Sequence, residues 1–443
     1  MPTSLSFTRE IPLRHDVDVF VAGGGPAGVA AALAAARRGA SVFLAEGQGC
    51  FGGMGTAGLV PAFMQFGDGI NFLAGGVGRE VYDRLFAAGG VGPDDKKDHG
   101  ACVCGIRAEA LKRVYDEMMT ESGAGFAFGT QMVAVEAAEG AVSHVVCAGK
   151  SGLFAVRARV FVDATGDGDL AAWAGAPYEK GDAQGNLMPG TLCSLYADID
   201  WGAARASGVG HYQVLEQAIA DGVFTNPDRH LPGFWRVGRH IGGGNIGHTF
   251  GVDGTDERSL TEALLWGRQY QREYQRFYRE YLTGYEAMEL VATGSLLGIR
   301  ETRRITGDYT MTLADFHARA GFPDEIGRYS YPVDIHASNT DLASFKQFEE
   351  EFHTLRYGEG ESYGIPFRAL VPRDLRNVLV AGRCVSTDRY MQSSIRVMPG
   401  CYITGQAAGL AAALATNGDV RAVDVTALQR ELAAMGGYLP NCG

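Results

Sequence analysis

The sequence predicts an α/β fold in which a parallel sheet with flanking helices carries an antiparallel β-meander and an inserted α+β domain. Residues 17–46 run from an apolar segment through a glycine turn and an Ala-rich segment to a second apolar segment. Residues 377–416 again combine a short apolar segment with a segment rich in small residues. The middle section instead carries most of the His and Trp residues. We therefore predict one domain formed by 1–181 and 371–443, interrupted by a substrate or cap domain at 182–370.

The first segment has the residue order of a dinucleotide-binding strand–turn–helix–strand unit. Gly23 permits the tight turn, Gly25 lets the backbone approach a pyrophosphate, and Gly28 lets the helix pack closely on the strand. The N-terminus of the predicted helix offers free N–H groups to the phosphates. Glu46 ends the second apolar run, where a carboxylate can bind both ribose hydroxyls. These residues leave the choice between FAD and NAD open.

A second match to the same glycine spacing, Gly242-x-Gly244-x-x-Gly247, lacks this context. Basic residues precede it instead of an apolar strand, and no helical segment follows it. We predict a flexible loop there, because the spacing alone carries little information.

Length and charge exclude several classes of protein. The chain has 443 residues, which favours two domains, and a net charge of −12 without any basic stripe. We therefore expect no nucleic-acid partner and no binding to anionic membrane surfaces. Residues 1–14 lack the pattern of a leader, and no apolar run reaches the ~18 residues of a membrane span. We expect a cytoplasmic protein.

Eight cysteines are scattered along the chain without any C-x-x-C pair. Cys102 and Cys104 are the only close pair, and no second pair completes a zinc or iron–sulfur set. The pattern predicts free thiols and no metal centre.

Periodicity predicts further elements along the chain. Apolar spacing indicates helices near 73–88 and over Arg107–Ser122, and a long polar–aromatic helix over Leu260–Tyr281. Short alternating runs indicate the strands of the meander, at 132–135, 142–148, 153–156 and 160–162. The last of these leads into Asp163–Asp169, and 377–381 is a further buried strand before the small-residue helix 403–416.

Taken together, these blocks resemble the FAD-dependent oxidoreductase family within the glutathione-reductase-like flavoproteins. The chain is also similar, more distantly, to the flavoprotein subunits of fumarate reductase and succinate dehydrogenase. The resemblance rests on five blocks that span nearly the whole chain: Gly23–Glu46, Gly52–Thr56, Asp163–Asp169, Gly298–Arg304 and Ala381–Gly409.

The resemblance implies a Rossmann-like FAD-binding domain with FAD as the cofactor. Matching positions imply that FAD contacts Gly23, Gly25, Pro26, Ala27, Gly28, Glu46, Gly53, Met54, Thr56, Ala164, Thr165, Gly166, Gly382, Arg383 and Cys401. A helix that begins near 399–402 is expected to point its N-terminus at the pyrimidine edge of the flavin and to stabilise negative charge there.

Differences between this sequence and the related flavoproteins limit how FAD is attached and which class of flavoprotein we expect. No His precedes Gly52 where the succinate dehydrogenase relatives attach FAD, and Cys50 does not match that position, so we expect non-covalent FAD. No second nucleotide-binding unit is present, which disfavours a reductase with its own NAD domain. The His-Pro-Thr and catalytic Arg pattern of the fumarate reductases is not recognisable.

Three side chains are candidates for catalysis: His336, His248 and Arg396. A histidine can abstract a proton near neutral pH, although either one can equally be a buried structural residue. Arg396 precedes the expected flavin-facing helix and could hold a substrate carboxylate or the flavin O2. Within Arg300–Arg304, Glu301 favours internal ion pairs and a structural or cofactor-supporting role.

The leading hypothesis is a dehydrogenase or oxidase that transfers a hydride from a small organic substrate to N5 of the flavin. One alternative is a flavin-dependent reductase of an activated C=C or C=O bond, supplied by an external electron donor. Another is a flavin electron-transfer subunit, which normally brings iron–sulfur cysteines or a docking extension. The electron acceptor (oxygen, a quinone or a carrier protein), the substrate and the oligomeric state stay open.

Overall fold

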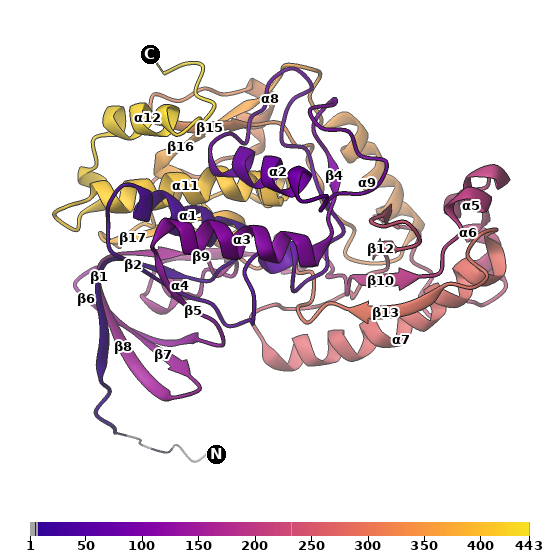
Figure 1. The fold of residues 1–443 in the computed structure, drawn as a ribbon, viewed down its shortest axis with the longest axis horizontal. Helices are drawn as coiled ribbons and strands as arrows, with labels where there is room; N and C mark the ends of the chain where they lie inside the picture. The colour runs from indigo at the N-terminus through magenta and orange to yellow at the C-terminus, as the bar shows by residue number, and fades with distance from the viewer. Residues whose placement is uncertain (1–4, 6–7, 232, 443) are drawn as a thin grey trace.

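The structure, a computed structural model, describes residues 5, 8–231 and 233–442 (Figure 1). Its main sheet has the strand order β5-β2-β1-β8-β7-β6, and β17 pairs with β8 beside that path. The parallel part consists of β5 (Gly125–Ala127), β2 (Val42–Ala45), β1 (Leu13–Ala22), β8 (Gly152–Asp163) and β17 (Val378–Val380). The predicted α/β fold with a parallel sheet is confirmed.

The antiparallel meander extends the same sheet. It comprises β6 (Gln131–Ala138), β7 (Ala141–Gly149) and the first half of β8. The second half of β8 lies between β1 and β17. The sequence predicted two strands at 153–156 and 160–162, but a single long strand covers both, because Arg157 and Arg159 alternate outward and form ion pairs with Asp16 and Asp18 of β1.

Small residues let two helices pack tightly behind the main sheet. These are α1 (Pro26–Arg37) and α11 (Met398–Leu414), which lie side by side although they come from opposite ends of the chain (Figure 1). A Cβ on Gly405 or Gly409 would lie 2.2 Å or 2.0 Å from the carbonyl oxygen of Ala27 or Ala31, respectively. Only glycine therefore permits this approach. The remaining helices of this layer are α2 (Val77–Ala87), α3 (Ala108–Ser122) and α12 (Val425–Ala434).

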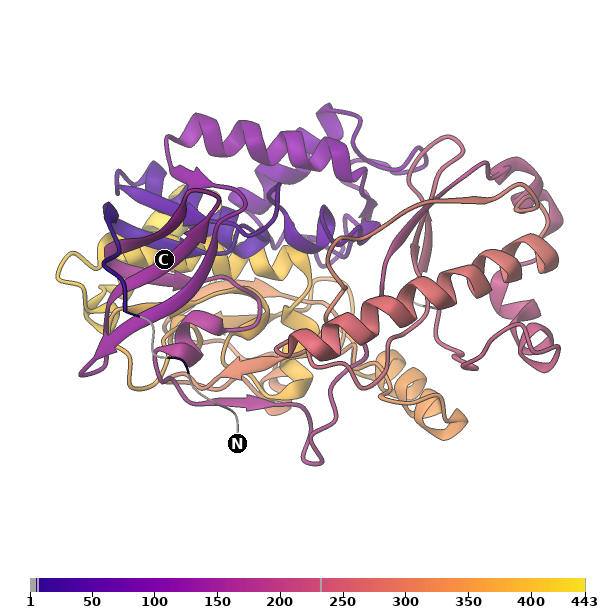
Figure 2. The same ribbon diagram turned by 90° about the horizontal axis from the view of Figure 1, so that it is seen from below.

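A second sheet lies at the opposite end of the molecule, next to the long helix α7 (Glu257–Tyr281), as Figure 2 shows. Its antiparallel strands have the order β11 (Gly233–Arg236), β12 (Gly242–Asn245), β10 (Ser194–Ala197) and β13 (Glu289–Thr293). Two short helices, α5 (Trp201–Ser207) and α6 (His211–Ala220), complete this lobe. Its apolar side chains form cores of their own, drawn from residues 192–297.

The prediction of a flexible loop at 242–247 is wrong, because Gly242–Asn245 form the inner strand β12. Glycine serves packing here rather than flexibility. A Cβ on Gly242 would lie 2.4 Å from the ring of Phe234, and one on Gly243 would lie 2.4 Å from the side chain of Pro61.

Most of residues 303–371 pack on the main body, whereas residues 342–354 also reach the second lobe, where Phe348 packs on His230. Side chains from Ile305 to Val371 join the same core as β1 and α11. The elements of this stretch are α8 (Leu313–Ala318), α9 (Leu342–Thr354) and the strand pairs β9 (Tyr178–Lys180)–β14 (Arg303–Ile305) and β15 (Glu325–Tyr329)–β16 (Tyr363–Pro366). The domain limits 1–181, 182–370 and 371–443 stay predictions. Among the described helices, none has the length and apolar character that crossing a membrane requires.

Candidate active site

One cavity of about 1170 Å³ runs from the carboxyl ends of β1 and β8 to the second lobe. Ligand pockets of proteins commonly measure ~300–1,000 Å³, so this cavity has room for a dinucleotide and a further small molecule. Backbone at the glycine turn lines one end, which we call the cofactor end. The other, which we call the substrate end, is lined by Asn245, Arg300, Tyr331, Asp334, His336 and Arg396.

The cofactor end is built by the glycine turn between β1 and α1. Gly25 caps α1 and no other atom lies within 4 Å of the position that its Cβ would take, so the backbone is open to a ligand. Glu46 follows β2, and its carboxylate accepts hydrogen bonds of 2.6 Å from the N–H groups of Gly24 and Gln48. Burial raises the pKa of Glu46. The turn, the helix N-terminus and the acid thus have the arrangement that binds a pyrophosphate and a ribose.

Most of the predicted cofactor residues line this cavity. They are Gly23, Gly25, Pro26, Ala27, Glu46, Gly53, Met54, Ala164, Thr165, Gly166, Gly382, Arg383 and Cys401. Gly28 lies behind the wall, where a Cβ would lie 1.8 Å from the carbonyl oxygen of Gly23, in keeping with its predicted packing role. Thr56 differs from the prediction: it is fully buried away from the cavity and donates a hydrogen bond of 2.5 Å to the carbonyl of Phe51.

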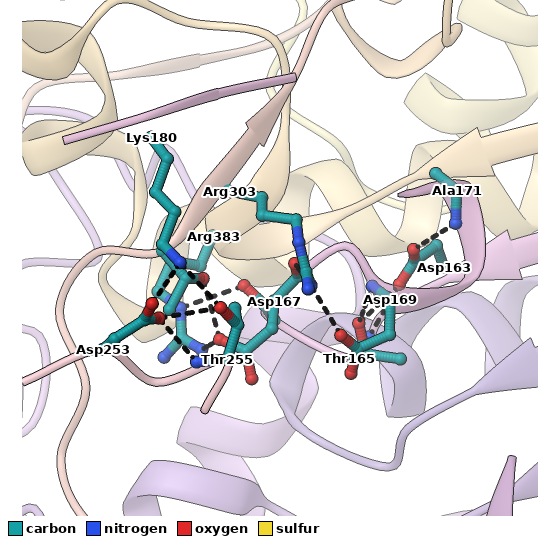
Figure 3. A network of polar contacts seen from close by, with 12 residues as sticks. Asp163, Thr165, Asp167, Asp169, Ala171, Lys180, Asp253, Thr255, Arg303 and Arg383 are labelled. Atoms are coloured by element: carbon teal, nitrogen blue, oxygen red, sulfur yellow. Dashed lines mark hydrogen bonds and ion pairs between the residues drawn. The ribbon is translucent and has the colours of Figure 1, made fainter. Parts of the chain in front are cut away.

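A polar network holds the turn after β8 against the cofactor end (Figure 3). The Asp163 carboxylate accepts hydrogen bonds from the hydroxyl of Thr165 at 2.7 Å and from the N–H of Ala171 at 2.9 Å. Burial raises the pKa of Asp163 to about 6. Arg303 forms an ion pair with Asp169 at 2.7 Å.

Arg383 joins three segments at the same turn. Its guanidinium forms an ion pair with Asp167 and donates to the carbonyls of Gly166 at 3.0 Å and Ile299 at 2.7 Å. The predicted cofactor residue Arg383 therefore shapes the cavity wall through the backbone that it holds.

The N-terminus of α11 faces the cavity between its two ends. Val397 caps the helix, and Val397, Met398 and Cys401 line the cavity. Burial raises the pKa of Cys401 to about 12, so this cysteine is a neutral thiol at pH 7. The helix N-terminus thus offers N–H groups and a positive dipole end to a bound ring system.

The structure brings the two predicted catalytic histidines together, although 88 positions separate them. Nε2 of His248 lies 2.9 Å from Nδ1 of His336. On its other side, Nδ1 of His248 lies 2.8 Å from the carboxylate of Asp228. Nε2 of His336 lies 3.3 Å from the carboxylate of Asp334. His336 and Asp334 line the cavity, whereas His248 lies behind them and borders a second, small void.

Burial is the main cause that lowers the pKa of His336 well below its ordinary value, and Arg300, His248 and Arg396 add to it. His336 is therefore a neutral imidazole at pH 7, which can accept a proton. A third histidine, His230, stacks on His336 with ring centroids 4.3 Å apart. Sequence reasoning missed His230 and Asp228, because neither belongs to a motif and both reach the site only through the fold.

The two arginines at the substrate end have different partners. The predicted residue Arg396 forms an ion pair of 3.0 Å with Asp334. Arg300 is buried and donates to the carbonyl of Pro189 and the hydroxyl of Thr191, both at 2.9 Å. Within the part of the chain that the structure describes, Arg300 forms no ion pair with a carboxylate. Burial and the neighbouring Arg396 lower the pKa of Arg300 to about 10, so it stays cationic at pH 7.

Ion pairs inside the Arg300–Arg304 block were expected, and one of its arginines has such a pair, while a second pairs with a carboxylate outside the block. Arg304 pairs with Glu301 at 2.6 Å, and Arg303 pairs with Asp169. Arg300 departs from that expectation, since Glu301 turns instead to Arg304 and Arg389. A signal was available in the sequence, because one glutamate cannot neutralise three arginines.

Comparison with family profiles gives a match over most of the chain. The sequence profile of the family described as "FAD dependent oxidoreductase" matches residues 18–432. No curated protein matches this sequence.

Similar solved structures are distant in sequence. A geranylgeranyl bacteriochlorophyll reductase-like protein from Thermoplasma acidophilum is 12% identical with a TM-score of 0.45, over 95% of this chain and 83% of that chain. A flavin-dependent brominase is 13% identical with a TM-score of 0.45, over 95% and 83%. A p-nitrophenol 4-monooxygenase from Pseudomonas putida is 12% identical with a TM-score of 0.40, over 67% and 70%.

Proposed function

The chain belongs to the FAD dependent oxidoreductase family, and from this premise we propose that it is a dehydrogenase or oxidase of a small organic anion. Its cofactor is FAD. In the proposed reaction, a substrate carbon gives up a hydride to N5 of the flavin and a neighbouring substrate heteroatom gives up a proton. We propose that FAD is bound non-covalently and that oxygen, a quinone or a carrier protein accepts the electrons.

The residues of the cofactor end fit FAD. The open backbone at Gly25 and the N-terminus of α1 would hold the pyrophosphate, and Glu46 would hold the adenosine ribose. The N-terminus of α11 would face the flavin ring. Bound there, FAD supplies the two-electron acceptor for the hydride. The cavity continues past this position to the substrate end, which leaves space for a second molecule.

The guanidinium of Arg300 is the main observation in favour of an anionic substrate. A buried charge without an ionic partner is costly, so a site that keeps one is adapted to a ligand of the opposite charge. Arg300 lines the cavity and is held by Thr191 and Pro189, which fixes its direction without neutralising it. A carboxylate on the substrate would supply the missing charge and orient the reacting carbon.

The His336–Asp334 pair supports oxidation as the direction of the reaction. A neutral imidazole at the cavity wall can take the proton that leaves the substrate heteroatom. The Asp334 carboxylate lies 3.3 Å from this imidazole and is itself held by Arg396 at 3.0 Å. The substrate end thus combines an anion holder and a base, two groups that serve the oxidation of a hydroxy or amino acid.

The test is anaerobic reduction of the bound flavin by matched substrate pairs. Each pair consists of a 2-hydroxy or 2-amino acid and its uncharged amide, and the loss of the flavin absorption band is followed. We expect bleaching by some acid and much slower bleaching by its amide. Equal rates for both members would overturn the anionic substrate. Bleaching by NAD(P)H alone would overturn the dehydrogenase in favour of a reductase, and a protein that cannot be loaded with FAD would overturn both.

A further inference from the structure

Four side chains form a continuous row from the cavity into the protein. Asp334 and His336 stand at the cavity wall, His248 lies behind His336, and Asp228 lies behind His248. The three successive contacts measure 3.3 Å, 2.9 Å and 2.8 Å. The middle one, between the two imidazoles, is a hydrogen bond, and the outer two are close approaches of an imidazole nitrogen to a carboxylate oxygen. All four residues are less than a tenth exposed.

The three contacts of the row can hold three protons, whereas two neutral imidazoles supply only two. Each neutral imidazole carries one N–H, whereas three contacts between the two imidazoles and two carboxylates need three protons. With two protons, one contact joins two lone pairs, which is unfavourable between buried groups. A third proton removes this contact between lone pairs and places a positive charge between the two carboxylates.

We propose that Asp228, His248, His336 and Asp334 form a proton relay that accepts the substrate proton at the cavity and passes it toward the surface. This inference rests on the proposed function, because the oxidation supplies the proton. For each substrate oxidised, one C–H bond breaks with its electron pair going to the flavin as hydride. One O–H or N–H bond breaks with its electrons staying on the substrate as the new double bond, and that proton enters the His336–Asp334 pair. In the proposal His336 is the catalytic base, while His248 and Asp228 are positioning residues.

The inner end of the row reaches a second void. This void measures about 10 Å³, room for roughly one water molecule, and Asp228, His248, Asn339 and Thr340 line it. The Asn339 side chain above it is exposed to solvent. A proton that arrives at Asp228 is therefore close to the surface, on the side of His248 that faces away from the substrate.

Charged groups around the row favour its proton transfer in one direction. Arg300 and Arg396 face His336 from the cavity side and disfavour a lasting positive charge there. Tyr331 lies 3.4 Å from the Asp334 carboxylate, and His230 stacks on His336. At the far end, the carboxylate of Asp228 lies beside His248, whereas the charges beside His336 on the cavity side include two arginines.

The same histidines could instead be read as a metal site, since ring nitrogens of His230, His248 and His336 lie within 4.8 Å of one another. Two contacts speak against this reading. His230 and His336 stack face to face at 25°, whereas ligands of one ion point their ring edges at a common centre. Nε2 of His248 and Nδ1 of His336 already form a hydrogen-bonding pair.

The first test does not depend on activity. In the FAD-loaded enzyme with ¹⁵N-labelled histidine, NMR follows the ring nitrogens of His248 and His336 against pH. We expect both to change at one common pH, because coupled groups titrate as a unit. The Asp228→Asn variant should separate the two titrations, and His230→Phe, which keeps an aromatic ring on His336, should leave them coupled. Independent titration in the unchanged enzyme would overturn the relay. A stoichiometric metal in the purified protein that His230→Phe removes would also overturn it.

The second test follows flavin reduction by the best substrate of the matched-pair experiment. His248→Gln keeps the size of the side chain but cannot carry the proton onward. We expect its reduction rate to fall about 10-fold to 100-fold at neutral pH, with recovery at higher pH and unchanged substrate affinity. An unaltered rate and pH profile would overturn the relay while leaving the proposed function intact. Failure of every substrate would overturn the proposed function and leave the NMR test of the relay standing.

Discussion

The two ends of the cavity are lined by different chemical groups. At the cofactor end, the wall is mainly backbone, with glycines that let chain segments and a ligand approach closely. At the substrate end, charged and aromatic side chains converge from segments far apart in the sequence. Backbone presents the same groups whatever the neighbouring side chains are, so the first end suits a fixed cofactor. The second end can change its ligand through a few substitutions.

The largest effect on stability is expected at a glycine that packs against the protein backbone rather than against the cofactor. Gly28→Ala would place a methyl group 1.8 Å from the carbonyl oxygen of Gly23 and force α1 away from β1. We expect a loss of about 3 kcal/mol or more in the free energy of unfolding of the apoprotein. Chemical denaturation measures it. Gly25→Ala is the matched control: its Cβ meets no protein atom, so it should keep the stability and lose FAD affinity. Equal losses of stability in both variants would contradict this division.

The pH dependence of stability tests the network behind the cofactor end. Burial raises the pKa of Asp163 from 3.8 to about 6, so the folded protein binds more protons than the unfolded chain between these values. The free energy of unfolding should therefore fall as pH rises through this window, by up to about 3 kcal/mol from this group. The Asp163→Asn variant should lack that fall in denaturation curves collected from pH 4 to pH 6. Parallel curves for the two proteins would show that Asp163 is not responsible.

At the substrate end, substitution of Arg300 should alter substrate binding and leave FAD binding at the cofactor end unchanged. Arg300→Met removes the charge while keeping much of the apolar stem, and we expect kcat/KM for an anionic substrate to fall about 100-fold. The flavin spectrum and FAD content should stay as in the unchanged enzyme. Arg300→Lys should recover part of the loss, because it restores the charge without the planar fork. Release of FAD by Arg300→Met would mean that this residue serves the cofactor instead.

The smallest effect is expected at the bridge between β9 and the start of α7. Lys180 forms an ion pair with Asp253, and their side chains are 27% and 34% exposed. Exposed pairs of this kind contribute little, so Lys180→Gln should change the free energy of unfolding by less than about 1 kcal/mol. Thermal denaturation in low and high salt checks this, and a larger loss would show that the bridge holds the two lobes together.

The residues of the cofactor end could be predicted from the sequence more completely than those of the substrate end, and the reason is physical. Gly23 to Glu46 form a contiguous motif whose spacing follows from one strand, one turn and one helix, so local rules predict it. The neighbours of His336 come from positions such as Asp228 and His248, which only the tertiary fold brings together. The glycines at 242–245 misled the prediction, because side chains of Phe234 and Pro61, invisible in the local pattern, decide that they form a strand.

The pairing of α1 with α11 has a consequence for the order of events during synthesis. A ribosome that has made residues 1–377 has released the glycine turn but not yet β17 or α11, which complete the sheet edge and the cavity wall. Contacts between such distant segments form late and slowly. The emerging chain therefore exposes the Ala-rich face of α1 until β17 and α11 have been made, and FAD can be held firmly only once these segments have folded. Chaperones should consequently be needed until α11 has been made, and FAD only after that point.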